Sequence, residues 1–226
     1  MIIKNKHRNY VYYILFANLG IYLLQKMNPN FFKNLVLNSL TVQSQPWTII
    51  TSMFMHGSSS HLLFNMYALL LFGTLIEQKI GSKRFLLLYF SSGIIGALTF
   101  IIIRPGASAI GASGAIMGLL GMTIMVLPKM RVLFFFLVPM SMRTAGIIFA
   151  FIDIIGLFNP NNGIANSAHL GGLIVGLLYG WYLINKKNTF AKEFVSYASH
   201  HSTYNKTKNI EMNDEDINNY IKYGKL

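Results

Sequence analysis

One serine and one histidine in this 226-residue chain stand in patterns that could support acyl transfer. Ser113 lies within the segment Gly111–Gly114, which reads GASG, and His169 opens a series of regularly spaced glycines. A serine hydroxyl is a weak nucleophile until a neighbouring base takes its proton, so a serine and a histidine within hydrogen-bond reach are the minimum for this reaction. The pair is therefore a candidate catalytic centre if the fold brings the two side chains together.

His61 and Asn65 are four residues apart, so on a helix they share one face and present hydrogen-bond donors to the same region. An anionic tetrahedral intermediate needs fixed donors, each worth about 3 kcal/mol in soluble enzymes. We expect these two side chains, with the backbone N–H of Ser113, to be candidates for such an oxyanion site. His56 lies five residues before His61 and off its face, and we expect it to support the shape of the cavity.

The composition places these residues in a membrane. Hydrophobic residues make up 53% of the chain and charged residues 12%, and five of the seven acidic residues lie after residue 185. The net charge of +12 comes from small basic groups between apolar runs, which argues against nucleic acid as a partner. Without cysteine the chain has no thiol nucleophile and no cysteine metal site.

Six apolar windows are near the length needed to cross a bilayer. We expect an all-α polytopic membrane protein, a bundle of six transmembrane helices. The windows are Tyr10–Gln25, His61–Ile80, Phe85–Ile103, Gly111–Leu127, Thr144–Phe158 and Ala168–Ile184.

Basic residues cluster on the side of the membrane that holds the N-terminus, so the positive-inside rule predicts that both ends are cytoplasmic. We expect a multi-pass protein of the cell membrane with a cytoplasmic N-terminus (1–9), a membrane-embedded domain (10–185) and a polar, loosely ordered tail (186–226). The first window has no convincing cleavage site after it, so we interpret it as a retained span.

Two stretches between the windows are not predicted to cross. Lys26–Met55 mixes apolar and polar residues and should lie at the outer interface, with Trp47 at headgroup level. Val132–Met140 is short and bounded by prolines, which favours a cytoplasmic interfacial loop, with a seventh span as the alternative.

The predicted topology brings the polar residues to one depth. His61, Ser113 and His169 stand at the starts of the second, fourth and sixth helices, and all three helices begin outside. Glycine stripes follow both reactive residues and would let the fourth and sixth helices touch, because membrane helices associate through close packing of small residues. These glycines are Gly114, Gly118 and Gly121 after the serine, and Gly172, Gly176 and Gly180 after the histidine.

With these motifs the chain resembles the rhomboid family of intramembrane serine proteases from about Trp47 to Tyr182. The resemblance rests on GxSG at 111–114, AHxxGxxxG at 168–176, HxxxxHxxxN at 56–65 and ExxxG at 77–81. It implies a catalytic dyad of Ser113 and His169, with His61 and Asn65 at the oxyanion. It also implies transmembrane proteins as substrates, cut near the outer leaflet, with no cofactor and no metal.

Two positions depart from the family pattern. Thr48 stands where many members have arginine after the tryptophan, which puts the anchoring of the first outer loop in doubt. Met117 stands where many have tyrosine, which puts in doubt what packs against the His169 ring. Asp153 lies within the fifth window and, nearer the inner half than His169, is expected to make a structural hydrogen bond rather than to act as a triad acid. Glu77 is expected to bind backbone or a loop cation.

Other functions remain open beside the protease. The chain has no HExxH zinc motif and only one intramembrane aspartate, so it lacks the residues of zinc and aspartyl intramembrane proteases. The alternatives are an inactive rhomboid-like protein that binds membrane clients, and a small transporter with a histidine proton path. The oligomeric state stays undetermined.

Overall fold

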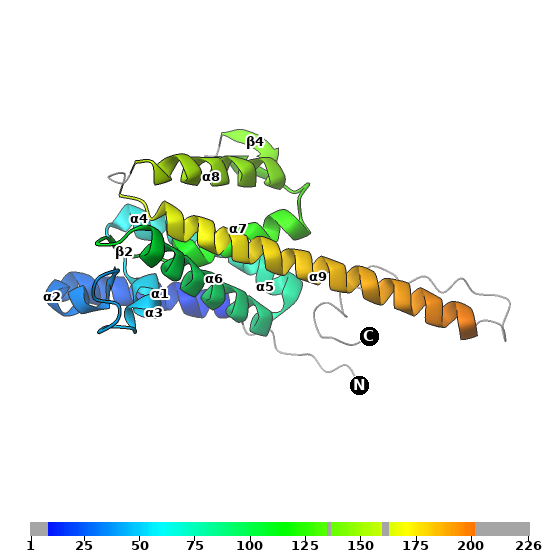
Figure 1. The fold of residues 1–226 in the computed structure, drawn as a ribbon, viewed down its shortest axis with the longest axis horizontal. Helices are drawn as coiled ribbons and strands as arrows, with labels where there is room; N and C mark the ends of the chain where they lie inside the picture. Colours follow the sequence, from blue (N-terminus) through cyan, green and yellow to red (C-terminus); the bar gives the residue numbers. More distant parts are fainter. Residues whose placement is uncertain (1–8, 135–136, 160–162, 202–226) are drawn as a thin grey trace.

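The computed structural model describes residues 9–134, 137–159 and 163–201, and the described chain is mostly helical. Figure 1 shows the longest helix, α9, with α6 and α7 beside it and α8 along its other side. The helices are α1 (Tyr10–Met27), α2 (Pro29–Phe32), α3 (Thr48–Thr51), α4 (Ser59–Ala68), α5 (Thr74–Ile80), α6 (Ser82–Ile103), α7 (Ser113–Val126), α8 (Met142–Leu157) and α9 (Asn166–His201). Two antiparallel pairs accompany them: β1 (Leu37–Asn38) with β2 (Ser108–Ala109), and β3 (Arg131–Phe134) with β4 (Val138–Ser141).

Three helical stretches of the described residues are long and apolar enough to cross a membrane: Ser59–Ile80, Ser82–Ile103 and Asn166–Lys187. The first of these joins α4 to α5 through a π-helical turn at Leu69–Gly73. The apolar helix α7 is shorter, with 14 residues, and α8 has 16. At 1.5 Å per residue α8 is about 24 Å long, less than the ~30 Å of a hydrocarbon core.

Two predicted segments differ from the structure. Val132–Met140 was expected to be a loop, but β3 and β4 pair there as a hairpin, with Val132 opposite Met140. The β-branched residues Val132 and Val138 suit paired strands, whose backbone groups hydrogen-bond to each other. The predicted loosely ordered tail begins at residue 186, whereas α9 continues as a helix to His201. Residues 202–226 lie outside the described part of the chain.

Glycine lets α7 and α9 approach until their backbones touch. A Cβ on Gly172 would overlap the carbonyl oxygen of Gly114, and a Cβ on Gly176 would overlap that of Gly118. The two stripes therefore face each other along the length of the helix pair. This packing sets the separation of the residues at the beginning of each helix.

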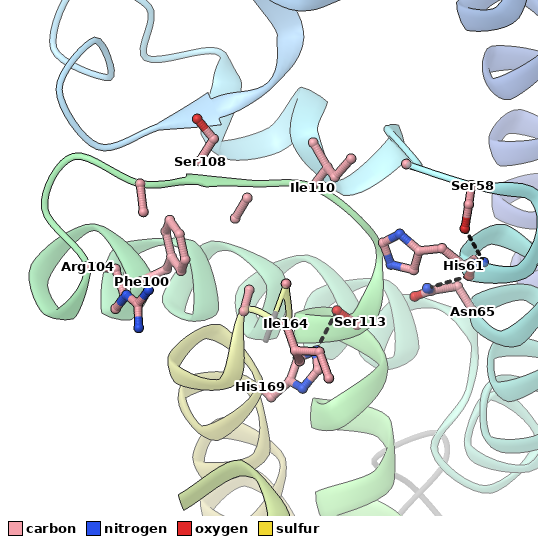
Figure 2. Close-up of a pocket in the computed structure, with 15 residues that line it drawn as sticks. Ser58, His61, Asn65, Phe100, Arg104, Ser108, Ile110, Ser113, Ile164 and His169 are labelled. Atoms are coloured by element: carbon pink, nitrogen blue, oxygen red, sulfur yellow. Dashed lines mark hydrogen bonds between the residues drawn. The ribbon is translucent and has the colours of Figure 1, made fainter. Parts of the chain in front are cut away.

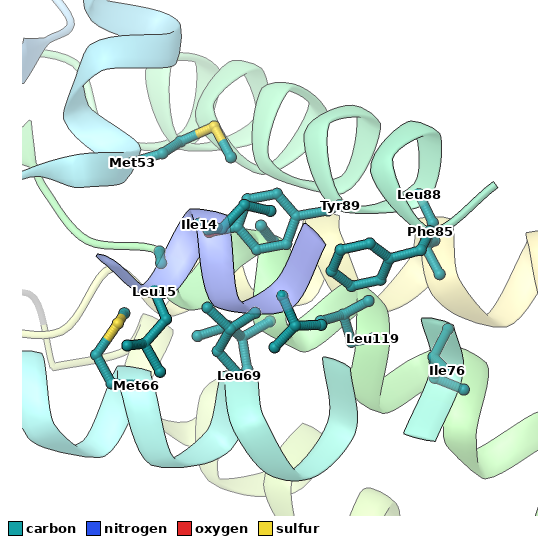
Figure 3. Packing of buried hydrophobic residues seen from close by; sticks show 14 of the residues in the cluster. Ile14, Leu15, Met53, Met66, Leu69, Ile76, Phe85, Leu88, Tyr89 and Leu119 are labelled. Carbon is teal, nitrogen blue, oxygen red and sulfur yellow. The ribbon is translucent and has the colours of Figure 1, made fainter. Parts of the chain in front are cut away.

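Large apolar side chains fill the space between α1, the α4–α5 segment, α6 and α7 (Figure 3). Phe85 and Tyr89 of α6 lie in this cluster and are fully buried. Residues of the other elements pack around them, among them Ile14, Leu15, Met66, Leu69, Ile76 and Leu119. The cluster holds the first half of the chain against α7.

Glu77 ties α5 to the first helix. Its two carboxylate oxygens accept hydrogen bonds from the backbone N–H groups of Tyr10 and Val11, at 2.9 and 3.1 Å. The first amides of a helix have no acceptor within it and carry a partial positive charge, so a carboxylate there stabilises α1. Of the two partners expected for Glu77, backbone or a loop cation, the structure contains backbone.

The segment between α1 and α4 is anchored through backbone acceptors. Trp47 donates its ring N–H to the carbonyl of Asn34 at 3.1 Å, and Thr51 donates its hydroxyl to Leu35 at 2.9 Å. Thr48 is buried and bonds the carbonyl of Gln45 at 2.7 Å. The loop thus has anchors of its own at the position where an arginine is absent.

Candidate active site

Ser113 and His169 are in direct contact. Oγ of Ser113 lies 2.8 Å from Nε2 of His169, although 56 residues separate them in the chain (Figure 2). Ser113 is the first residue of α7, and His169 is in the first turn of α9. The glycine contacts between these two helices bring their beginnings together, so the juxtaposition that the spacing predicts is present.

The loop before Ser113 has a shape that requires glycine. Gly111 has a φ of +113°, and a Cβ there would lie 2.7 Å from Nε2 of His61. Its N–H donates to the carbonyl of Ser52 at 2.9 Å, which fixes the loop. Gly114 faces the carbonyl of Ala168 across the helix pair. Both glycines therefore support the site by leaving space, at Gly111 for His61 and at Gly114 for α9.

His61 and Asn65 face the serine from α4, on the opposite side from His169 (Figure 2). Asn65 donates from Nδ2 to the carbonyl of His61 at 2.8 Å, and its Oδ1 has no hydrogen-bond partner within the described structure. Because an amide NH₂ carries two hydrogens, one donor of Asn65 is still available to a ligand. Ser58 caps the helix by accepting a hydrogen bond from the backbone N–H of His61 at 3.1 Å.

His56 lies behind this face rather than in the cavity. Its ring is fully buried and meets the ring of His61 edge-on, with centroids 5.1 Å apart. The side chain of Gln25 holds the His56 backbone at both ends, donating to its carbonyl at 2.9 Å and accepting from its N–H at 3.2 Å. Burial, and next the neighbouring His61, lower the pKa of His56 from 6.5 to about 4. His56 is therefore a neutral, buried side chain whose ring packs against the ring of His61.

Asp153 also belongs to the site, and the expectation that it lies deeper in the bundle than His169 is wrong. Its Oδ1 is 2.9 Å from Nδ1 of His169, and its side chain is buried. Asp153 stands in the last third of α8, so it is near the end of the bundle where α9 begins. The position of Asp153 late in the apolar window was the signal in the sequence that could have placed it at the depth of His169.

A cavity of about 620 Å³ opens beside the serine. Ser113, His61, Asn65 and His169 line one end of it. Phe100 of α6 and Arg104, the residue that follows this helix, line the other end, with the β2 segment between the two ends. An extended peptide could therefore lie against the serine with its flanking residues along this cavity. Within the described part of the chain, no group of three or more histidine and carboxylate side chains is placed to hold a metal ion.

A protein-family model described as the Rhomboid domain matches residues 43–186. Several proteins of known name are similar to the chain. It is 39% identical over 163 residues to rhomboid protease GluP of Bacillus subtilis, an alignment that covers 70% of this chain and 30% of that protein. It is 36% identical over 143 residues to the putative rhomboid protease YdcA of the same organism, covering 62% and 69%.

A mitochondrial relative is also similar. Rhomboid protein 1, mitochondrial, of Saccharomyces cerevisiae is 31% identical over 192 residues, which cover 80% of this chain and 55% of that protein. The chain thus spans 30% of the length of the Bacillus protease GluP and 55% of the yeast protein. The relatives therefore include bacterial proteins and a protein named as mitochondrial.

Proposed function

This chain belongs to the rhomboid family of membrane-embedded proteases, and from that premise we propose that it is a serine endopeptidase with Ser113 as nucleophile and His169 as general base. It cleaves transmembrane segments of membrane proteins near the outer leaflet. The single observation that carries the proposal is the 2.8 Å contact between Oγ of Ser113 and Nε2 of His169 at the end of an open cavity.

In the first half of the reaction, Oγ of Ser113 attacks the scissile carbonyl carbon while its proton passes to Nε2 of His169. The carbonyl oxygen becomes an oxyanion, and the donors on the facing side stabilise it: the second amide hydrogen of Asn65, the ring of His61 and the Ser113 N–H. The first amides of α7 have no acceptor within the helix, which suits them to negative charge. When the tetrahedral intermediate collapses, its carbon–nitrogen bond breaks and the amine leaves with the proton from His169. The remaining half of the substrate stays bound to Ser113 as an acyl-enzyme.

In the second half, a water molecule gives a proton to His169 and its oxygen attacks the acyl carbon. The ester bond breaks, Ser113 recovers its proton, and the new carboxyl end of the substrate leaves. Gly57 and Ser58, the first two residues of the polar segment Gly57–Ser60, line the cavity and support the entry of water at this depth. The substrate backbone must be extended to reach the serine. The preferred scissile bond therefore follows a small residue in a transmembrane helix that unwinds easily.

The proposed membrane arrangement is a bundle of six spans, with α1, α7 and α8 crossing beside the three longer helices. Both termini lie in the cytoplasm of a cell-membrane protein, with a peptidase domain at 10–185. The excess of lysine and arginine on that side supports this orientation. The outer ends of α4, α7 and α9 then carry His61, Ser113 and His169, at one depth.

The test is cleavage of a labelled transmembrane substrate by the purified protein in liposomes. Ser113→Ala and His169→Ala should each abolish cleavage and labelling by a fluorophosphonate. Ser113→Ala should keep the wild-type thermal unfolding midpoint, whereas His169→Ala should lower it, because it leaves the buried carboxylate of Asp153 without that partner. Ser91→Ala is the matched control, because the Ser91 hydroxyl donates to the carbonyl of Leu88 in its own helix at 3.2 Å and does not line the cavity. It should leave both readouts unchanged. Undiminished cleavage by Ser113→Ala refutes the assignment. No cleavage or labelling by the wild type would favour an inactive client-binding protein.

A further inference from the structure

The two-residue mechanism gives no task to Asp153, although its carboxylate touches the His169 ring. Nδ1 of His169 lies 2.9 Å from Oδ1 of Asp153, while Nε2 of the same ring faces Ser113. We propose that Asp153 is a positioning residue that binds the Nδ1–H of His169 and so keeps Nε2 free to take the serine proton. The inference rests on the proposed function, because it concerns the same reaction.

The position of one ring hydrogen decides whether Nε2 of His169 can accept the serine proton. A neutral imidazole carries its hydrogen on either Nδ1 or Nε2, and an ionised carboxylate can only accept hydrogen bonds. The contact with Asp153 therefore selects the form of His169 with the hydrogen on Nδ1. Nε2 then presents its lone pair to Oγ of Ser113. In the other form Nε2 would carry the hydrogen itself and could not accept the serine proton.

The contact with Asp153 also fixes the orientation of the His169 ring. Ser113 and Asp153 hold the two nitrogens of the His169 ring from two different helices, α7 and α8. A ring bonded at both nitrogens cannot rotate without losing one of the contacts. When His169 takes the serine proton it becomes positively charged, and a carboxylate already in place beside it stabilises that charge. Asp153 thus makes the alignment of the general base depend on α8.

A role in packing alone is the competing explanation. A buried carboxylate in an apolar helix needs a hydrogen-bond partner, and His169 supplies one whatever its function. The two explanations differ in what a substitution changes. Loss of a packing contact lowers stability, whereas loss of a positioning contact lowers turnover in a protein that is still folded and still binds substrate.

The decisive variant is Asp153→Asn, which keeps the shape of the side chain. Asparagine can turn its NH₂ group toward Nδ1, which would move the imidazole hydrogen to Nε2. We expect kcat to fall at least tenfold, within the ~10⁴-fold that this exchange costs in a soluble serine protease triad, with KM and the unfolding midpoint unchanged. Asp153→Glu, which retains a carboxylate, should keep more activity than Asp153→Gln, which has the same length.

Met142→Ala is the control for loosening α8. Met142 is fully buried at the opposite end of that helix from Asp153, so its truncation should lower the unfolding midpoint and change kcat less than Asp153→Asn does. A kcat of Asp153→Asn within threefold of wild type overturns the inference. So does a loss of activity in Met142→Ala and Asp153→Asn that follows the loss of stability in both.

A second measurement reads the proton without relying on activity. Nitrogen NMR of histidine-labelled protein distinguishes a protonated from an unprotonated ring nitrogen, and the His169 signals are those that disappear in His169→Ala. We expect the hydrogen on Nδ1 in Ser113→Ala, which is inactive by design, and a shift toward Nε2 when Asp153→Asn is added. If Ser113→Ala still cleaves, the proposed function fails. Only the role of Asp153 fails if Ser113→Ala is inactive, adding Asp153→Asn leaves the Ser113→Ala spectrum unchanged, and Asp153→Asn alone has the kcat of the wild type.

Discussion

The carbonyl oxygen of Gly118 in α7 lies where a side chain of Gly176 in α9 would begin. The contact is between two backbones, and it lies two turns along α9 from the residue that touches Ser113. Any atom added at this point must push the two helices apart. Ser113 and His169 are therefore held at hydrogen-bonding distance because the helices that carry them have no side chains at their contact.

Gly176→Ala should both lower the stability of the protein and slow substrate cleavage. The added methyl overlaps the Gly118 carbonyl, and overpacking of this kind costs about 1–3 kcal/mol. The separation of α7 from α9 must increase, so we expect cleavage to fall at least tenfold. Thermal unfolding in detergent measures the loss of stability, and the liposome assay measures the loss of cleavage.

Gly20→Ala is the control, because a Cβ at Gly20 meets nothing within 4 Å. Helix propensity favours alanine over glycine by about 0.5–1 kcal/mol, so this variant should not be destabilised. Equal behaviour of the two variants would contradict the packing argument.

Gly111→Ala should reduce cleavage more than its backbone strain alone explains. The φ of +113° disfavours alanine, and the new Cβ would also lie 2.7 Å from Nε2 of His61. The His61 ring must move, so the oxyanion donors are displaced and kcat should fall at least tenfold. Gly106→Ala separates the two causes, since Gly106 has a φ of +85° with open space around its Cβ position. Its strain of about 1–2 kcal/mol should lower stability and leave kcat within about twofold. A similar loss of kcat in both variants would remove the role of His61 from the explanation.

Stability should fall as the pH is lowered from 7 toward 4, and part of that fall should come from His56. The pKa of His56 is about 4 in the folded protein against 6.5 when it is free of the fold. Between these values the unfolded chain binds the proton and the folded protein does not. The stabilisation is therefore complete above pH 6.5 and is lost as the pH falls through this window, by about 2 kcal/mol at pH 5.

His56→Phe keeps a ring of similar position and removes the titration. Each protein is compared with its own unfolding midpoint at pH 7, so a general effect of the substitution cancels. The decrease between pH 7 and pH 5 should be smaller in His56→Phe than in the wild type. A decrease of the same size in both proteins would mean that His56 is not the group responsible.

Much of the candidate site can be predicted from the sequence because a membrane restricts the backbone to helices. Consecutive apolar windows then cross the membrane in opposite directions. Residues at the starts of every second window therefore lie at the same end of the bundle. Glycine at intervals of three and four residues marks the faces that can touch, which is how Ser113 and His169 could be paired across 56 residues. The number of crossings stays a prediction, since three helical stretches are long and apolar enough by themselves.

The residues that the sequence did not place are those whose setting depends on one particular helix packing. Asp153 is a single acidic residue in an apolar segment. The spacing of the apolar residues does not predict which neighbouring helix its side chain contacts. The hairpin of β3 and β4 pairs residues such as Val132 and Met140, but hydropathy measures only whether a stretch is apolar and carries no record of strand pairing. Composition and spacing by themselves indicated the membrane class and the pairing of Ser113 with His169. Only the tertiary structure decided that a carboxylate stands behind the histidine, because the tilt and rotation of α8 are set by contacts with other helices.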